Sequence, residues 1–202
     1  MIEYSIASFY DLLLFPFVKL IRYKVLEIAQ EYNFKSILDV CCGTGNQLKL
    51  LRKHGFNVSG IDISDEMLVI SRIGKYKPNC IREDAADMSF NNESFDMAMI
   101  TFGLHEKNRE TAENIIHEMN RVISKNGYIM IIDFNIDENT SIISKSIIRL
   151  IERIAGKDHY RHFRKYISFG GLEVLLKDMD FKEVNKYFFA SNGIVLRLLK
   201  NI

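Results

Sequence analysis

The stretch "ILDVCCGTGN", residues 37–46, decides the fold. It is an apolar run that ends in Asp39, followed by two cysteines and a small-residue loop that contains Gly43 and Gly45. The apolar run predicts a buried strand, and the glycine loop predicts a sharp turn into a helix. A second acid, Asp62, closes the next apolar run in "GIDIS". A glycine loop after the first strand and an acid after the second are the general layout of nucleotide-type binding in doubly wound sheets.

Similar apolar runs alternate with segments of helical spacing along the chain. The pattern predicts strands over 36–40, 57–61, 95–101 and 128–133. It predicts helices over 47–54, 65–74 and 108–124, with Asn126-Gly127 ending the last of them. A helix over 171–179 and two strands over 181–190 and 193–200, joined by a hairpin turn, complete the chain. Alternating strands and helices imply an α/β fold, with a parallel sheet covered by helices on both faces.

The chain is expected to form a single domain over residues 1–202, because its length and its 48% hydrophobic content suit one well-filled core. Two segments lie outside the alternation: an aromatic N-terminal helical cap over 1–34 and a helical insertion over 139–167. Within the insertion, residues 145–165 carry seven lysines and arginines against two acids. This excess is typical of a solvated helix face, and it also suits an anionic substrate or a lipid surface.

The net charge and the cysteines narrow the class of protein. A formal charge of +1 gives no reason to expect nucleic acid as a partner. Cys41, Cys42 and Cys80 are an odd number of cysteines and a poor framework for disulfides, which fits a reducing compartment and predicts a cytoplasmic protein. A metal or redox role for Cys41 and Cys42 is disfavoured, because no second cysteine pair exists to complete a site. No secretory or transmembrane segment is expected.

Electrostatics distinguishes two classes of ligand for the glycine loop. The dinucleotide fingerprint needs a third glycine at position 48, where the chain has Leu48. A pyrophosphate would also lie close to the carboxylate of Asp39, and two like charges about 4 Å apart repel by roughly 4 kcal/mol at an effective dielectric near 20. S-adenosylmethionine instead brings a sulfonium and an ammonium, and the carboxylate of Asp62 can accept hydrogen bonds from its ribose diol. The loop therefore fits a methyl donor better than NAD.

At these residues the sequence resembles the class I S-adenosylmethionine-dependent methyltransferases. "LDVCCGTG" resembles their first motif, "REDAADMSF" (82–90) their adenine-edge motif, and "FDMAMITFGLHE" (95–106) their fourth strand. The resemblance implies a Rossmann-like sheet of seven strands with the last one antiparallel, and S-adenosylhomocysteine as the product. It also implies donor-site residues: Asp39, Cys41, Gly43 and Gly45 for the methionine part, Asp62 for the ribose, Ile63, Met67, Asp84 and Ala85 for the adenine, and Thr101 at the end of the fourth strand.

Within the family, "YDLLL" (10–14) and "FRKYISFGGL" (163–172) are similar to the ubiquinone/menaquinone-biosynthesis C-methyltransferases. This similarity implies a small-molecule acceptor of quinone-like kind. The aromatic N-terminus and the apolar faces of the insertion favour an aromatic or lipid-like acceptor, with peripheral membrane contact as an option. His105 follows the fourth strand and is the candidate general base, since an ordinary imidazole titrates near neutral pH. The alternative is that His105 caps the next helix or hydrogen-bonds the loop. The methylated atom and the oligomeric state remain open.

Two other functions compete with a methyltransferase. The first is an NAD(P)-linked oxidoreductase, which would need a phosphate-tolerant loop. The second is a non-catalytic partner subunit with a methyltransferase fold, which would bind no donor.

Overall fold

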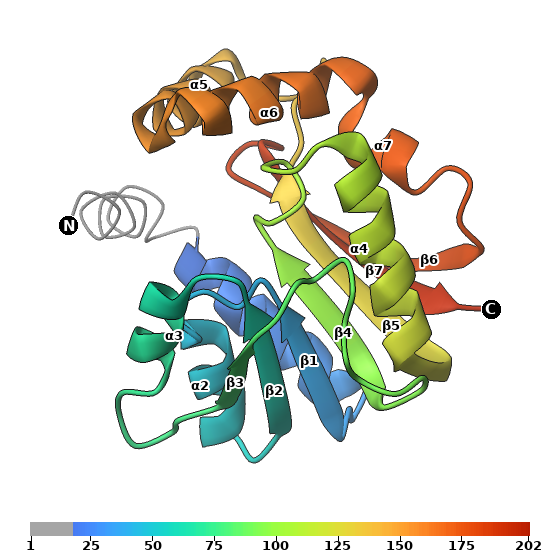
Figure 1. Cartoon of the computed structure of the whole chain (residues 1–202). Helices are drawn as coiled ribbons and strands as arrows, with labels where there is room; N and C mark the ends of the chain where they lie inside the picture. The colour runs from blue at the N-terminus through green and yellow to red at the C-terminus, as the bar shows by residue number, and fades with distance from the viewer. Residues whose placement is uncertain (1–17) are drawn as a thin grey trace.

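Within residues 18–202, which are the residues that the computed structural model describes, seven strands form one sheet (Figure 1). Their order across the sheet is β3-β2-β1-β4-β5-β7-β6. The strands are β1 (Ser36–Val40), β2 (Asn57–Asp62), β3 (Asn79–Arg82), β4 (Phe95–Thr101), β5 (Ile123–Phe134), β6 (Phe181–Phe189) and β7 (Ile194–Asn201). The strands β1 to β5 pair in parallel, and β7 pairs antiparallel with both β5 and β6. The predicted doubly wound sheet with an antiparallel last strand is confirmed.

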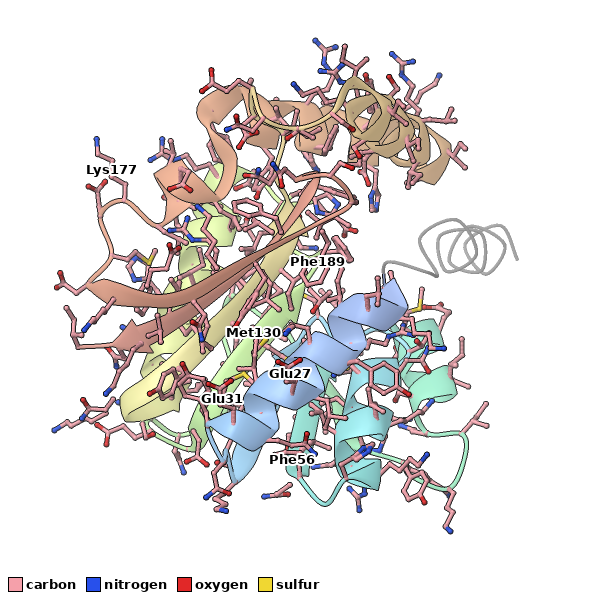
Figure 2. All side chains as sticks on the ribbon, turned by 180° about the vertical axis from the view of Figure 1, so that it is seen from behind. Glu27, Glu31, Phe56, Met130, Lys177 and Phe189 are labelled. Carbon is pink, nitrogen blue, oxygen red and sulfur yellow. The ribbon has the colours of Figure 1, made fainter. Side chains whose placement is uncertain are left out.

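The helices cover both faces of this sheet. They are α2 (Asn46–Lys53), α3 (Asp65–Ser71), α4 (Arg109–Val122), α5 (Ile142–Ala155), α6 (Lys157–Phe169) and α7 (Gly171–Leu175), preceded by a helix over residues 18–31. The core on one face packs residues of α4 and α7 against the sheet, and the core on the other face packs α2, α3 and the helix over 18–31. Figure 2 shows this N-terminal helix, which carries Glu27 and Glu31, crossing the back of the sheet. Alternate strand residues feed the two cores, as Ile37 and Leu38 illustrate.

The helix starts follow the caps that the sequence contains. The Ser64 side chain accepts a hydrogen bond from the Met67 N–H at the start of α3, and Asn108 accepts one from the Thr111 N–H at the start of α4. Each cap satisfies an N–H that has no partner inside its helix. The caps therefore fix where the two helices begin: α3 starts three residues after the end of β2, and α4 starts after the loop that follows β4 and contains His105.

The expected insertion is a pair of helices, α5 and α6, above the carboxyl ends of β4 and β5 (Figure 1). The single-domain organisation and the lid role of this pair stay predictions. None of the described helices is long and apolar enough to cross a membrane. Residues 1–17 of the expected N-terminal cap lie outside the described residues.

Two expectations about the elements were incomplete. The strand β3 was not predicted. It is a four-residue strand at the edge of the sheet with only one buried residue, so its sequence shows no clear hydrophobic pattern. Asn126-Gly127 does not end α4, which stops at Val122; it lies instead within β5, where the pairing with β4 shifts register and Asn126 has a φ of 61°.

Candidate functional site

The loop between β1 and α2 turns through left-handed backbone. Cys41, Gly43 and Gly45 have φ values of 59°, 53° and 67°. A Cβ added at Gly43 would meet nothing within 4 Å, so this backbone is open to a ligand, whereas one at Gly45 would lie 3.1 Å from Ser71 Cβ. The loop is tied to β2 by a hydrogen bond from the Cys42 N–H to the Ile61 carbonyl (2.9 Å). Gly43 thus provides exposed backbone, while Gly45 permits close packing at the start of α2.

Asp62 is held at the end of β2 by the backbone on both sides of it. Its Oδ2 accepts a hydrogen bond from the Gly43 N–H at 2.7 Å, and its Oδ1 accepts one from the Ser64 N–H at 2.9 Å. Each carboxylate oxygen has a further lone pair, so the group can still accept hydrogen bonds from a diol. The carboxylate of Asp62 therefore links the glycine loop to the start of α3 and can still accept hydrogen bonds from a ligand.

Asp39 is the next-to-last residue of β1 and is more deeply buried than Asp62: its exposed fraction is only 4%. Burial raises its pKa well above the usual value, and Cys80 and Asp62 add to the rise while the Arg22 charge opposes it. The charged carboxylate is therefore costly in the ligand-free protein, and a nearby cation would relieve that cost. This is an observation of the structure itself that fits a cationic donor and disfavours a pyrophosphate.

The residues expected to hold an adenine lie at the ends of β2 and β3. Ile63 is 60% exposed, Met67 is half-buried, and Ala85 is buried. Asp84 is exposed, and its Oδ1 accepts a hydrogen bond from the Ala86 N–H at 2.9 Å. An apolar surface therefore lies at the carboxyl edge of β2 and a carboxylate at that of β3, as a base with an exocyclic amine would need.

The end of β4 is also a strained turn. Thr101 is half-buried, and Phe102, the next residue, has a φ of 56° and donates its N–H to the Ile132 carbonyl at 2.8 Å. A non-glycine residue in this region costs free energy and is concentrated at functional sites. The left-handed conformation of Phe102 turns the chain from β4 into the buried segment that contains His105.

His105 is 1% exposed and lies in a cluster of carboxylates. Its Nδ1 hydrogen bonds to Asp133 Oδ1 at 2.6 Å, and its Nε2 lies 3.7 Å from Glu152 Oε2 and 4.0 Å from Glu106 Oε1. Burial alone lowers the pKa of His105, but the carboxylates of Asp133, Glu152 and Glu106 outweigh it and raise the pKa to about 9. The imidazole is therefore protonated at neutral pH, and it bridges β5 to α5.

Three partners of the predicted residues were missed from the sequence. Asp133 is the next-to-last residue of β5 and also accepts hydrogen bonds from the N–H groups of Leu104 and His105. Glu152 is fully buried on α5, and Cys80 lies with its sulfur 3.8 Å from that of Cys42. Asp133 could have been found, because an acid at the end of an apolar strand was the signal that identified Asp62; Glu152 and Cys80 carry no such local signal.

No group of three or more histidine, cysteine or acidic side chains among residues 18–202 is arranged to hold a metal ion. Two hollows, of about 500 Å³ and about 280 Å³, lie at the amino edge of the parallel strands, beside Lys125 and Phe56 respectively. Neither hollow is lined by a predicted site residue. The predicted residues gather at the opposite, carboxyl edge, where open α/β sheets bind ligands.

Comparison with known proteins agrees with this geometry. A family model described as a methyltransferase domain matches residues 37–127. An uncharacterised protein of Methanocaldococcus jannaschii is 30% identical over 189 residues, which cover 89% of this chain and 72% of that protein. A demethylmenaquinone methyltransferase of Thermotoga maritima is 28% identical over 154 residues, which cover 75% of this chain and 61% of the enzyme.

Among solved structures, a magnesium protoporphyrin IX methyltransferase from Synechocystis with bound S-adenosylhomocysteine superimposes with a TM-score of 0.66. It is 15% identical and the match covers 91% of this chain and 83% of that one, so it supports the fold. The matched family domain begins within β1 and contains both Asp39 and Asp62. The chain belongs to the class I S-adenosylmethionine-dependent methyltransferases, whose methyl donor is S-adenosylmethionine.

Proposed function

We propose that this chain transfers a methyl group from S-adenosylmethionine to a small hydrophobic acceptor of aromatic, quinone-like or lipid-like kind. The observation that carries the donor half is the pairing of Asp39 and Asp62 with the open backbone at Gly43. Two carboxylates beside bare backbone at one edge of a sheet suit a cationic amino acid joined to a ribose, and they repel the phosphates of a dinucleotide.

Each donor-site residue has a proposed role that matches its surroundings. The carboxylate of Asp39 faces the cationic methionine part, and Asp62 accepts hydrogen bonds from the ribose hydroxyls. Ile63 and Met67 contact the adenine ring, and Asp84, with the Ala85 N–H, recognises the edge of the base. Cys41, Gly43, Gly45 and Thr101 contribute the surrounding backbone and wall of the site.

The acceptor half is supported by an exposed aliphatic stripe on α5. Ile143, Ile147, Leu150 and Ile154 follow one another at spacings of three and four residues, and they are between 41% and 72% exposed. Such spacing places them on one face of the helix. An aliphatic face beside the carboxyl ends of β4 and β5 favours an apolar acceptor over a sugar or a nucleotide.

Charge beside this stripe favours delivery of the acceptor from an anionic membrane surface. Lys145, Arg149 and Arg153 follow each other at intervals of four residues on the same helix. Figure 2 shows nitrogen-tipped side chains projecting from the α5 and α6 pair. An amphipathic helix with a basic flank is the usual form of peripheral lipid contact. The name of the Thermotoga relative, a demethylmenaquinone methyltransferase, points to the same lipid-like class.

His105 is best assigned a positioning role. A general base must be neutral and must reach the acceptor, whereas this imidazole is buried and its pKa is raised to about 9. Methyl transfer from a sulfonium is an in-line displacement that is accelerated by orienting the acceptor and excluding water. The cluster of His105, Asp133 and Glu152 would serve this purpose by fixing α5 over the end of β4.

The test is calorimetry followed by an acceptor screen. We expect micromolar binding of S-adenosylmethionine and S-adenosylhomocysteine, about a hundredfold weaker binding by Asp62→Ala, and unchanged binding by the exposed control Asp178→Asn. Formation of S-adenosylhomocysteine with short-chain quinols, phenols or phospholipids then identifies the acceptor. Binding of NADH, detected by fluorescence, without donor binding would refute the proposal in favour of an oxidoreductase; binding of neither would favour a partner subunit.

Membrane delivery is tested separately with vesicles. We expect sedimentation with vesicles of anionic phospholipid and none with vesicles of phosphatidylcholine alone, with Ile147→Asp abolishing it. A protein that ignores both kinds of vesicle contradicts delivery from a membrane and leaves the donor assignment intact. A cytoplasmic location is also proposed; it is supported by the three cysteines, all of which are free thiols.

A further inference from the structure

Two thiols from distant parts of the chain meet at the loop between β1 and α2, residues 41–45, which we call the donor loop. Cys42 Sγ lies 3.8 Å from Cys80 Sγ, although 38 positions separate the two residues. They reach each other across β2 at Gly60, which pairs with Cys80 in the sheet. A Cβ added at Gly60 would lie 2.8 Å from Cys42 Sγ, so the contact exists because this position has no side chain.

We propose that Cys42 and Cys80 form a reversible disulfide, and that this modification switches off donor binding. The proposed disulfide joins Cys42 to Cys80 and not to Cys41, its neighbour in the sequence. Cys42 is half-buried and Cys80 is buried, and both are free thiols. The proposal does not depend on which acceptor is methylated.

The surroundings shift the pKa values of the two thiols in opposite directions, so that Cys80 is the thiolate and Cys42 is the thiol that donates a hydrogen bond to it. The hydrogen bond from Cys42 lowers the pKa of Cys80 to about 7 against the effect of burial, with help from Ser71, Lys49 and Arg72. The same contact, together with burial, raises the pKa of Cys42. Cys80 is therefore the nucleophile, since the thiolate is the reactive form.

The oxidant is a small hydroperoxide, and the reaction balances in two steps. The Cys80 thiolate attacks the terminal oxygen of the hydroperoxide and breaks the O–O bond, which gives a sulfenic acid and, after uptake of one proton, an alcohol, or water when the oxidant is hydrogen peroxide. The Cys42 sulfur then attacks the sulfenic sulfur, and the hydroxyl group departs with the Cys42 proton as water. A dithiol returns the pair to two thiols by exchange.

Closing the bond would move the donor loop. A disulfide needs its sulfurs about 2.05 Å apart, so the present separation of 3.8 Å has to shrink. Cys42 directly precedes Gly43, whose N–H donates to Asp62. Pulling Cys42 toward β3 therefore displaces the backbone that faces the donor, and we expect the oxidised protein to bind S-adenosylhomocysteine at least about tenfold more weakly.

The experiment treats the full chain with hydrogen peroxide and maps the products. Trypsin should release Cys80 within residues 76–82, and Cys41 and Cys42 together within residues 36–49. We expect the two fragments to be linked after oxidation and separate after dithiothreitol. Calorimetry with S-adenosylhomocysteine should show weak binding by the oxidised protein and full recovery on reduction.

Two variants identify the partners. Cys41→Ser should keep the link, because burial raises the pKa of Cys41 to about 12 and its sulfur is not the one that contacts Cys80. Cys80→Ser, with Cys80→Ala as a second variant if the serine form does not fold, should lose both the link and the effect of peroxide on binding. The proposal is overturned if no linked fragment forms, if the link requires Cys41, or if the linked protein binds the donor product as well as the reduced protein does.

Discussion

The charge state of His105 makes stability depend on pH in a direction that can be worked out. Its pKa is about 9 in the folded protein, against the usual value of 6.5. Because the folded state holds the proton more tightly, the stabilisation is fully present below pH 6.5 and is lost as the pH rises toward 9. At about 1.36 kcal/mol for each pH unit, the difference amounts to about 3 kcal/mol of unfolding free energy.

Several charged groups face this imidazole and set the size of the effect. Asp133 contributes from β5, Glu152 from α5 and Glu106 from the loop after β4. From α6, His159 lies 3.7 Å from Glu106 Oε1, and the ring of Tyr166 lies 6.3 Å from that of His105. Tyr166 is buried, and burial raises its pKa well above 10, so it stays neutral across this range.

The assay is urea unfolding, followed by circular dichroism, at about pH 6 and about pH 9.5. We expect the unfolding free energy of the wild type to fall by about 3 kcal/mol more than that of His105→Gln, which cannot carry the charge. The exposed His117→Gln on α4 is the matched control and should behave as the wild type. Parallel pH profiles for the wild type and His105→Gln would refute the reasoning, and so would an imidazole of His105 that titrates by NMR near its ordinary pKa.

Two of the remaining predictions concern the loop after β1, and the third concerns the contact between α4 and the segment that precedes β4. Gly60→Ala should lower the unfolding free energy by roughly 1–3 kcal/mol in urea melts, because its Cβ would lie 2.5 Å from Leu48 Cδ1; an unchanged midpoint would contradict the packing. Asp39→Asn removes a buried carboxylate whose charge is costly in the absence of a cation, so it should raise the unfolding temperature of the donor-free protein. It should also weaken donor binding at least about tenfold, because the cationic donor loses its partner. A variant that changes only stability or only binding would contradict the idea that one charge accounts for both. Arg121→Ala should cost about 1–2 kcal/mol of stability, because its guanidinium holds the Met88 and Phe90 carbonyls at 2.8 and 2.7 Å, and thermal melts would show it.

The elements that could be predicted from the sequence are those with a clear local pattern of apolar and polar residues. The bounds of β1 and β4 agree with the expected ranges residue for residue, because each is a short, mostly apolar segment flanked by polar or turn-forming residues. The resemblance to a family implied the candidate donor-site residues together, and the sheet brings them close because parallel strands place their carboxyl ends at one edge. This is why Asp39, Asp62 and Thr101 lie along the same edge although the first and the last are 62 positions apart in the sequence.

What could not be predicted depends on contacts between segments that carry no shared pattern. A buried glutamate on α5 is invisible in a segment that reads as a basic amphipathic helix, and only packing shows that Glu152 faces His105. The same applies to Cys80, whose contact with Cys42 depends on the missing side chain of Gly60. His105 was predicted as a general base from the ordinary pKa of histidine, whereas the carboxylates around it raise its pKa to about 9, because the pKa of a buried group is set by its neighbours.

The buried charges divide the site into two halves with opposite electrostatic demands. On the donor side, the carboxylate of Asp39 lies among groups that raise its pKa, so this half is strained until a cation arrives. On the side of α5, the imidazolium of His105 already lies beside the carboxylates of Asp133 and Glu152, so its charge is compensated without a ligand. Donor binding should therefore change the ionisation of Asp39 and leave that of His105 unchanged. A donor-induced shift in the NMR titration of His105 would contradict this separation and would show that α5 and the donor loop act as one unit.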